Sequence, residues 1–147
     1  MVKFFTAFIA ATLILIAPQA YSRDSQYYFS IEDAMQSADF KERLDPTIRF
    51  YFGDQKHPEP LKLLGRFTSN KKTNAFNKTD EAACQWVLLS ALLSFQDRVR
   101  AEGGNAIINL NSYYKKNTFK SSTQYECHAG ALMAGVALSG EVVTLAP

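Results

Sequence analysis

The sequence contains few of the residues on which nucleotide and metal chemistry depends. Only two cysteines and two histidines occur in 147 residues, too few for the paired ligands of a zinc finger. No glycine is followed by Lys-Ser or Lys-Thr, so the loop that holds nucleotide phosphates in most ATPases is missing. The 16 basic residues nearly balance the 14 acidic ones, which requires neither nucleic acid nor an anionic membrane as a partner. We expect no nucleic-acid partner and no cofactor.

Long apolar runs are also scarce, and the one that stands out lies at the N-terminus. Residues 4–17 are apolar apart from two threonines and follow the single positive charge of Lys3. A membrane span needs about 20 apolar residues, so this shorter run is typical of a secretory signal peptide and predicts no membrane span. Small residues at positions 20 and 22 predict cleavage between Ser22 and Arg23. Because no cysteine follows the run to carry a lipid anchor, we expect a free periplasmic or secreted protein.

What remains, residues 23–147, suffices for one hydrophobic core and hence for a single domain, with residues 1–22 as the signal peptide. The strongest pattern within it predicts a helix over residues 80–102, with Thr79 as N-cap and Gly103 at its end. Its apolar residues recur at steps of three and four and should face a sheet: Cys84, Val87, Leu88, Ala91, Leu92, Phe95 and Val99. Three more apolar residues widen this surface and predict a helix covered on more than one side: Trp86, Leu89 and Leu93.

The rest of the domain indicates strands and one short helix. Ser30 followed by acids predicts a helix that runs to about Ala38. Alternating apolar residues predict strands over residues 47–53, 61–68, 105–114, 123–129 and 136–145. Residues 69–78, rich in Asn and Lys, are expected to form a loop, and Ala106, Ile108 and Leu110 to share one buried face. The order of elements predicts an α+β fold: an antiparallel sheet of four or five strands with the long helix across one face.

Three segments carry a family resemblance: residues 81–84 (Glu-Ala-Ala-Cys), 101–109 (Ala-Glu-Gly-Gly-Asn-Ala-Ile-Ile-Asn) and 125–131 (Tyr-Glu-Cys-His-Ala-Gly-Ala). They resemble a group of small exported bacterial proteins that often carry the description "excinuclease ATPase subunit". Residues 60–145 are more distantly similar to the YbjQ-like domain and to the sensor lipoprotein of the Rcs envelope-stress pathway. The YbjQ-like resemblance implies a small α+β domain that forms ring-shaped oligomers and has a proposed heavy-metal role. The Rcs resemblance implies disulfides and a signalling partner.

The excinuclease description conflicts with the residues themselves. Such an ATPase needs a phosphate-binding loop, a Mg²⁺-binding acid and a much longer chain. The lipid-bearing cysteine of the Rcs sensor is also missing here. We therefore expect this protein not to be an excinuclease ATPase, and we do not transfer the sensor's signalling role to it.

The two cysteines are the most informative chemical groups. An even number of cysteines in an exported chain favours a disulfide, because the compartment is oxidising. Cys84 lies on the helix stripe that should face the sheet and Cys127 in a predicted strand, so a bridge from helix to sheet is geometrically reasonable. Two buried free thiols are the alternative.

Cys127, His128 and His57 are weak candidates for metal ligands. Neighbours on a strand point to opposite faces, so Cys127 and His128 could bind one ion only across a bulge. His57, the other histidine, lies in a Lys-His-Pro turn and would have to fold over from a distant loop. Catalysis by a Cys–His pair would need an accessible thiolate. We therefore assign no metal site and no catalytic residue.

Two clusters of lysines occur in the predicted loops: Lys71, Lys72 and Lys78, and Lys115, Lys116 and Lys120. Such clusters can bind phosphate or anionic polymers, but they are more often solvated surfaces. Taken together, the sequence predicts an exported, non-enzymatic envelope protein, a binding or stress-related accessory domain. Its partner would be an unknown envelope protein or a small ligand, and a homo-oligomer is left open. The alternatives are a Cu- or Zn-binding oligomer and a hydrolase.

Overall fold

The computed structural model describes residues 17–18 and 22–147, and the expected signal peptide lies almost wholly outside them. Six strands form one sheet: β1 (Ser25–Ser30), β2 (Arg49–Phe52), β3 (Pro60–Asn74), β4 (Ala106–Ser112), β5 (Gln124–Ala129) and β6 (Met133–Leu145). The helices are α1 (Ile31–Gln36), α2 (Ala38–Arg43) and the long α3 (Asp80–Glu102), with a short 3-10 turn η1 (Tyr114–Lys116). None of the helices in the described residues is long and apolar enough to cross a membrane.

The sheet is organised around β6. Strand β3 pairs with it along its length on one side, while β5 and then β4 share the other side. Strand β1 lies outside β5 and β2 outside β4. The α+β class is confirmed, but the expected antiparallel sheet is wrong in one respect: β2 runs parallel to β4, so the sheet is mixed. A parallel pair needs a long crossover, and β3 together with α3 supplies the connection from β2 to β4.

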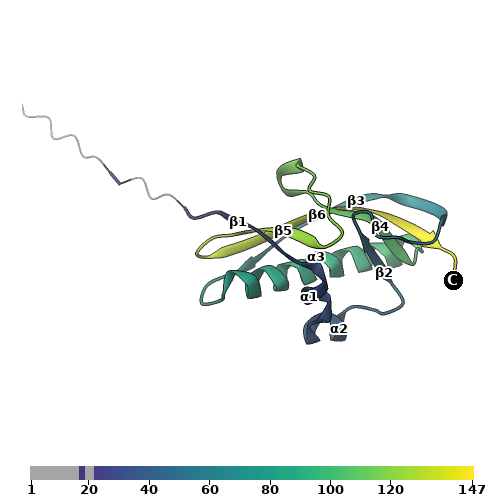
Figure 1. The fold of residues 1–147 in the computed structure, drawn as a ribbon, viewed down its shortest axis with the longest axis horizontal. Coiled ribbons are helices and arrows are strands. Elements are labelled where there is room, and N and C mark those ends of the chain that lie inside the picture. The colour runs from purple at the N-terminus through teal and green to yellow at the C-terminus, as the bar shows by residue number, and fades with distance from the viewer. Residues whose placement is uncertain (1–16, 19–21) are drawn as a thin grey trace, which may run out of the picture.

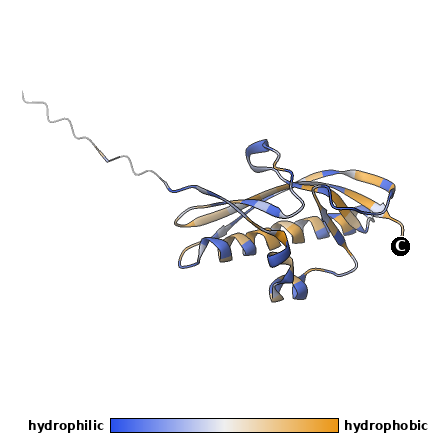
Figure 2. Ribbon diagram, in the orientation of Figure 1, coloured by the Kyte–Doolittle hydropathy of each residue, from blue (hydrophilic) through white to orange (hydrophobic). Residues whose placement is uncertain are grey.

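Helix α3 packs across one face of the sheet (Figure 1), as the apolar stripe predicts. Thr79 caps it by accepting a hydrogen bond from the Ala82 N–H, and Gly103 ends it in the left-handed conformation. All seven stripe residues are buried. The segment from α1 to Asp45 packs against a second side of the helix, because Gln96 accepts from the Asp45 N–H and Arg43 lies over the Trp86 ring. Figure 2 shows apolar residues concentrated where α3 meets the sheet.

Three expectations about the strands are corrected. The sheet has six strands rather than four or five, because β1 was not anticipated. The expected loop at 69–78 is strand as far as Asn74, since β3 is an edge strand whose outward Lys and Asn side chains stay solvated. In β4, the left-handed Asn109 shifts the register against β6, so Ile107 and Leu110 face α3. Ala106 and Ile108 instead join a small cluster with Val143 and Leu145.

Candidate functional site: a pocket on the outer face of the sheet

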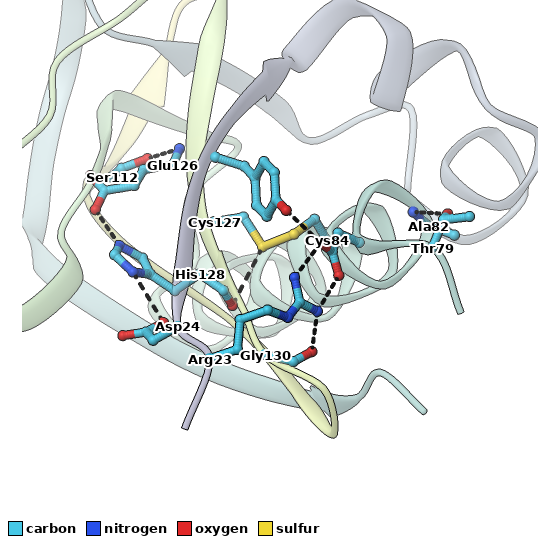
Figure 3. The surroundings of a disulfide bond; sticks show 12 residues. Arg23, Asp24, Thr79, Ala82, Cys84, Ser112, Glu126, Cys127, His128 and Gly130 are labelled. Atoms are coloured by element: carbon cyan, nitrogen blue, oxygen red, sulfur yellow. Dashed lines mark hydrogen bonds and ion pairs between the residues drawn. A yellow bond between two sulfur atoms is a disulfide. The ribbon is translucent and has the colours of Figure 1, made fainter. Parts of the chain in front are cut away.

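The disulfide fixes the orientation of strand β5. Cys84 of α3 and Cys127 of β5 are bonded, with an S–S distance of 2.05 Å and a separation of 43 residues (Figure 3). Both cysteines are buried, and neither is free. The helix-to-sheet pairing expected from the sequence is therefore confirmed. Neither sulfur is available as a thiolate for catalysis or metal binding.

His128 lies on the opposite face of β5 from Cys127, as strand alternation predicts. Its Nε2 lies 2.6 Å from Glu126 Oε1, and its Nδ1 lies 3.5 Å from a carboxylate oxygen of Asp24. The ring stacks on Tyr114 with centroids 3.5 Å apart and an angle of 11° between the planes. The imidazole ring is thus held between two carboxylates (Figure 3). One of its faces is covered by the ring of Tyr114.

Glu126 is the buried member of this group. Only 7% of it is exposed, and its backbone N–H donates to Ser112 Oγ at 2.9 Å. This bond links the start of β5 to the end of β4. The two strands pair with successive parts of β6, first β5 and then β4. Glu126 and His128 are two residues apart, so both side chains point to the outer face of the sheet.

A hollow of about 450 Å³ opens beside this pair. We call it the outer-face pocket. Its walls come from β1 and the residue before it, from β5 and from the loop after β4: Asp24, Gln26, Tyr28, Tyr114, Lys115, Asn117, Thr118, Phe119, Glu126 and His128. The ring of Phe119 packs on Tyr28 with centroids 4.6 Å apart, and Gln26 donates to the Tyr28 hydroxyl. Aromatic, amide and carboxylate groups therefore meet in one concave site.

The loop that closes the pocket is tied down by its own backbone. The Tyr113 N–H donates to the Ala137 carbonyl at 2.8 Å, and Ser112 and Phe119 exchange both backbone hydrogen bonds. Lys115 and Lys116 adopt left-handed conformations that turn the chain back over the sheet. The position of Tyr114 against His128 is thus set by the fold.

The three weak metal candidates do not converge. His57 lies elsewhere, with its ring against Tyr51 and its Nδ1 2.7 Å from the Pro58 carbonyl oxygen. Cys127 is bonded to Cys84 and points away from His128. In the described part of the chain, no three Cys, His, Asp or Glu side chains are arranged to hold a metal ion.

A second polar cluster holds Arg23, the expected first residue after signal cleavage. Its guanidinium forms two hydrogen bonds to the Asp80 carboxylate and one to the Gly130 carbonyl. The Tyr27 hydroxyl also donates to Asp80. The bond from Arg23, reinforced by that from Tyr27, lowers the pKa of Asp80 to about 2, and the same pairing raises the pKa of Arg23. The cluster fastens the beginning of the domain to the first turn of α3.

Several members of the outer-face pocket were missed from the sequence. Glu126 was detectable, because an acid two residues before His128 must share its face of a strand. Tyr28 and Asp24 were not, since they lie in an unassigned strand and directly before it. Tyr114 and Phe119 were not, since they come from a loop whose path local pattern does not fix.

No protein-family model matches the chain, and no curated protein or solved structure matches it either.

Proposed function

We propose that this chain is an exported, non-enzymatic envelope protein that binds a small polar ligand in the outer-face pocket. The observation that carries the proposal is the buried Glu126–His128 pair at the wall of an open hollow. Burying a carboxylate costs free energy, so buried carboxylates usually occur where they pair with another group or bind a ligand. The stacked Tyr114 and the bond to Ser112 hold the pair in place before any ligand arrives.

Two features support the export part of the proposal. The chain carries a disulfide, which is compatible with an oxidising compartment outside the cytoplasm. Residues 4–17 have the length and composition of a signal sequence. Neither feature depends on the outer-face pocket, so export and binding can be tested separately.

The chemistry of the pocket limits the kind of ligand. Carboxylates of Asp24 and Glu126 and amide oxygens of Gln26 and Asn117 accept hydrogen bonds, while Tyr28 and Phe119 offer apolar ring surface. A molecule with hydroxyl or amine groups on one side and a flat apolar side would satisfy both. We therefore propose a sugar-like or amine-bearing ligand.

A hydrolase is the second candidate, and one observation favours it: His128 has an acid at 2.6 Å beside a hollow. Two features weigh against it. Carboxylates lie against both ring nitrogens of His128, which leaves neither nitrogen free to bond to a substrate. Ser112, the serine next to the pair, is buried and its Oγ accepts from the Glu126 N–H. The metal-binding oligomer is weaker still, because Cys127 is bonded to Cys84.

The binding proposal is tested by NMR titration of residues 23–147. The probes are N,N′-diacetylchitobiose, spermidine and a low-molecular-mass periplasmic extract. We expect one of them to shift the amide resonances of Tyr28, Phe119 and His128. The variant His128→Gln should lose the response, while His57→Gln, the matched change at the other histidine, should keep it. Binding is contradicted if all three probes leave these resonances unmoved.

The same preparations separate binding from catalysis. A hydrolase would convert the ligand over the course of the titration, so that new product signals grow at the expense of the ligand signals. The proposal expects the ligand spectrum to remain unchanged in the presence of saturating protein.

A further inference from the structure

One end of the domain exposes three large apolar side chains together. Phe76 is 60% exposed, Leu132 63% and Met133 49%. Phe76 lies in the turn before α3, and Leu132 and Met133 lie in the β5–β6 hairpin. The two loops are joined, because the Ala75 N–H donates to the Leu132 carbonyl at 2.8 Å and Asn74 pairs with Met133. We call Phe76, Leu132 and Met133 the apolar tip; Figure 1 shows its two loops at the same end of the molecule.

Lysines surround this tip. Lys72 and Lys78 are exposed and Lys71 is half-buried, all within a few residues of Phe76 or of the strand positions that pair with the hairpin. Lys78 Nζ donates to the Asn74 carbonyl, which holds its charge beside the tip. Of the two acids that follow, Asp80 is already paired with Arg23 and Tyr27, and Glu81 is exposed on α3. The charge around the apolar tip is therefore mainly positive.

The chain also enters the domain at this end. Arg23 donates to the Gly130 carbonyl in the β5–β6 hairpin and to Asp80 at the start of α3. Residues 1–22, with the apolar run expected to act as the signal sequence, are therefore joined to the domain next to the tip.

We propose that the apolar tip is a peripheral docking site for an anionic phospholipid bilayer. Phe76, Leu132 and Met133 enter the boundary between headgroups and acyl chains, and Lys72 and Lys78 bind lipid phosphates. A second copy of this chain fits the tip less well, because a symmetric dimer through the tip would bring the same lysines of both copies together. The site is separate from the outer-face pocket and does not depend on the function proposed for it.

The test measures partition of residues 23–147, which contain every helix and strand of the described structure. Sedimentation uses vesicles of phosphatidylglycerol with phosphatidylethanolamine and, in parallel, vesicles of phosphatidylcholine alone. We expect binding to the anionic vesicles only, and binding that weakens as salt is added. Phe76→Ser with Leu132→Ser should lower the partition coefficient at least about tenfold. Lys72→Glu with Lys78→Glu should lower it by more than about twentyfold, since each lysine near such a surface contributes about fivefold.

The matched control is Leu61→Ser with Leu63→Ser. These leucines are 69% and 63% exposed and lie at the other end of β3, so the double variant should bind as well as the wild type. Three results overturn the proposal: no partition into anionic vesicles, equal partition into phosphatidylcholine, or an equal loss in the control variant. Concentration-dependent dimerisation that the tip variants abolish, without vesicle binding, would assign the tip to a second copy instead.

Discussion

The covalent link between Cys84 and Cys127 joins the middle of the core to the strand that carries the outer-face pocket. It closes a loop of 43 residues that includes most of α3, all of β4 and the loop over the outer face. In the chain-entropy view, closing such a loop restricts the unfolded chain more than the folded one. The bond therefore stabilises the pocket wall indirectly, through the fold.

Replacing both cysteines by alanine should lower the free energy of unfolding by about 4 kcal/mol, the entropy model's value for a loop of this length. Urea denaturation followed by far-UV circular dichroism measures the change. Wild-type protein treated with reductant is the control and should lose a similar amount, because it lacks the same link. A loss below about 1 kcal/mol in both would contradict a bond that constrains the unfolded chain.

Asp80 should make stability depend on pH in the acid range. Its pKa is lowered from 3.8 to about 2 by hydrogen bonds from Arg23 and Tyr27. A carboxyl with a lowered folded-state pKa stabilises the protein above its unfolded-state pKa, and that contribution is lost as pH falls through the folded value. Asp80→Asn should therefore be less stable than wild type at neutral pH, and the difference should shrink between pH 4 and about 2. Urea midpoints across this range measure it, and a difference that stays constant would exclude the pairing.

At this scale the sequence supported some assignments and not others. The Cys84–Cys127 bond followed from an apolar stripe and a strand, two features with strong periodicity. The outward direction of His128 followed from Cys127 facing inward. The neighbours Asp24 and Tyr114 could not be found, because they meet His128 only after β1 and the η1 loop are placed in space.

Among the elements, α3 is the one for which the sequence predicts both ends. Thr79 and Gly103 each satisfy backbone groups that a helix end leaves unpaired. Thr79→Ala should remove the bond to the Ala82 N–H and destabilise the protein by about 1 kcal/mol. Thr79→Ser keeps the oxygen and is the control, with a change of at most a few tenths of a kcal/mol. Thermal or urea denaturation distinguishes them, and equal stability of the two variants would show that the cap is dispensable.

Strand β4 shows why alternation alone can fail. The pattern from Ala106 to Leu110 reads as a regular strand, but Asn109 in the left-handed conformation inserts a bulge. The bulge moves Leu110 to the helix side together with Ile107 and leaves Ile108 on the outer face. Asn tolerates this conformation better than most residues, but an Asn in a sequence predicts a bulge only weakly, whereas the structure shows the bulge directly.

For the whole molecule, the α+β class and the single long helix were predictable, whereas the connectivity of the sheet was not. Strand β6 pairs with three other strands, and which half of it pairs with β5 or β4 depends on contacts distant in sequence. The parallel β2–β4 pair depends on the route of the chain through β3 and α3. Local sequence pattern predicts neither the pairing along β6 nor the parallel β2–β4 pair, because which strands pair depends on how they pack together in the shared core.

Export can be tested on the full chain, because it predicts both where the mature protein begins and whether its cysteines are bonded. We expect the exported species to begin at Arg23 and to be lighter than its reduced form by the two hydrogens lost in the Cys84–Cys127 bond. Both follow if residues 1–22 direct the chain to an oxidising compartment and are then removed. Intact-mass spectrometry before and after reduction, with alkylation of free thiols first, measures both.

Ser22→Phe places a large residue at the expected cleavage position and should leave an uncleaved precursor. Tyr21→Phe changes the neighbouring position, whose side chain does not affect cleavage, and this variant should be processed normally. Deleting residues 4–17 should keep the chain in the cytoplasm, where both cysteines should stay reduced. Both should then be alkylated in the assay. A wild-type protein that begins at Met1 with two alkylated thiols would contradict export.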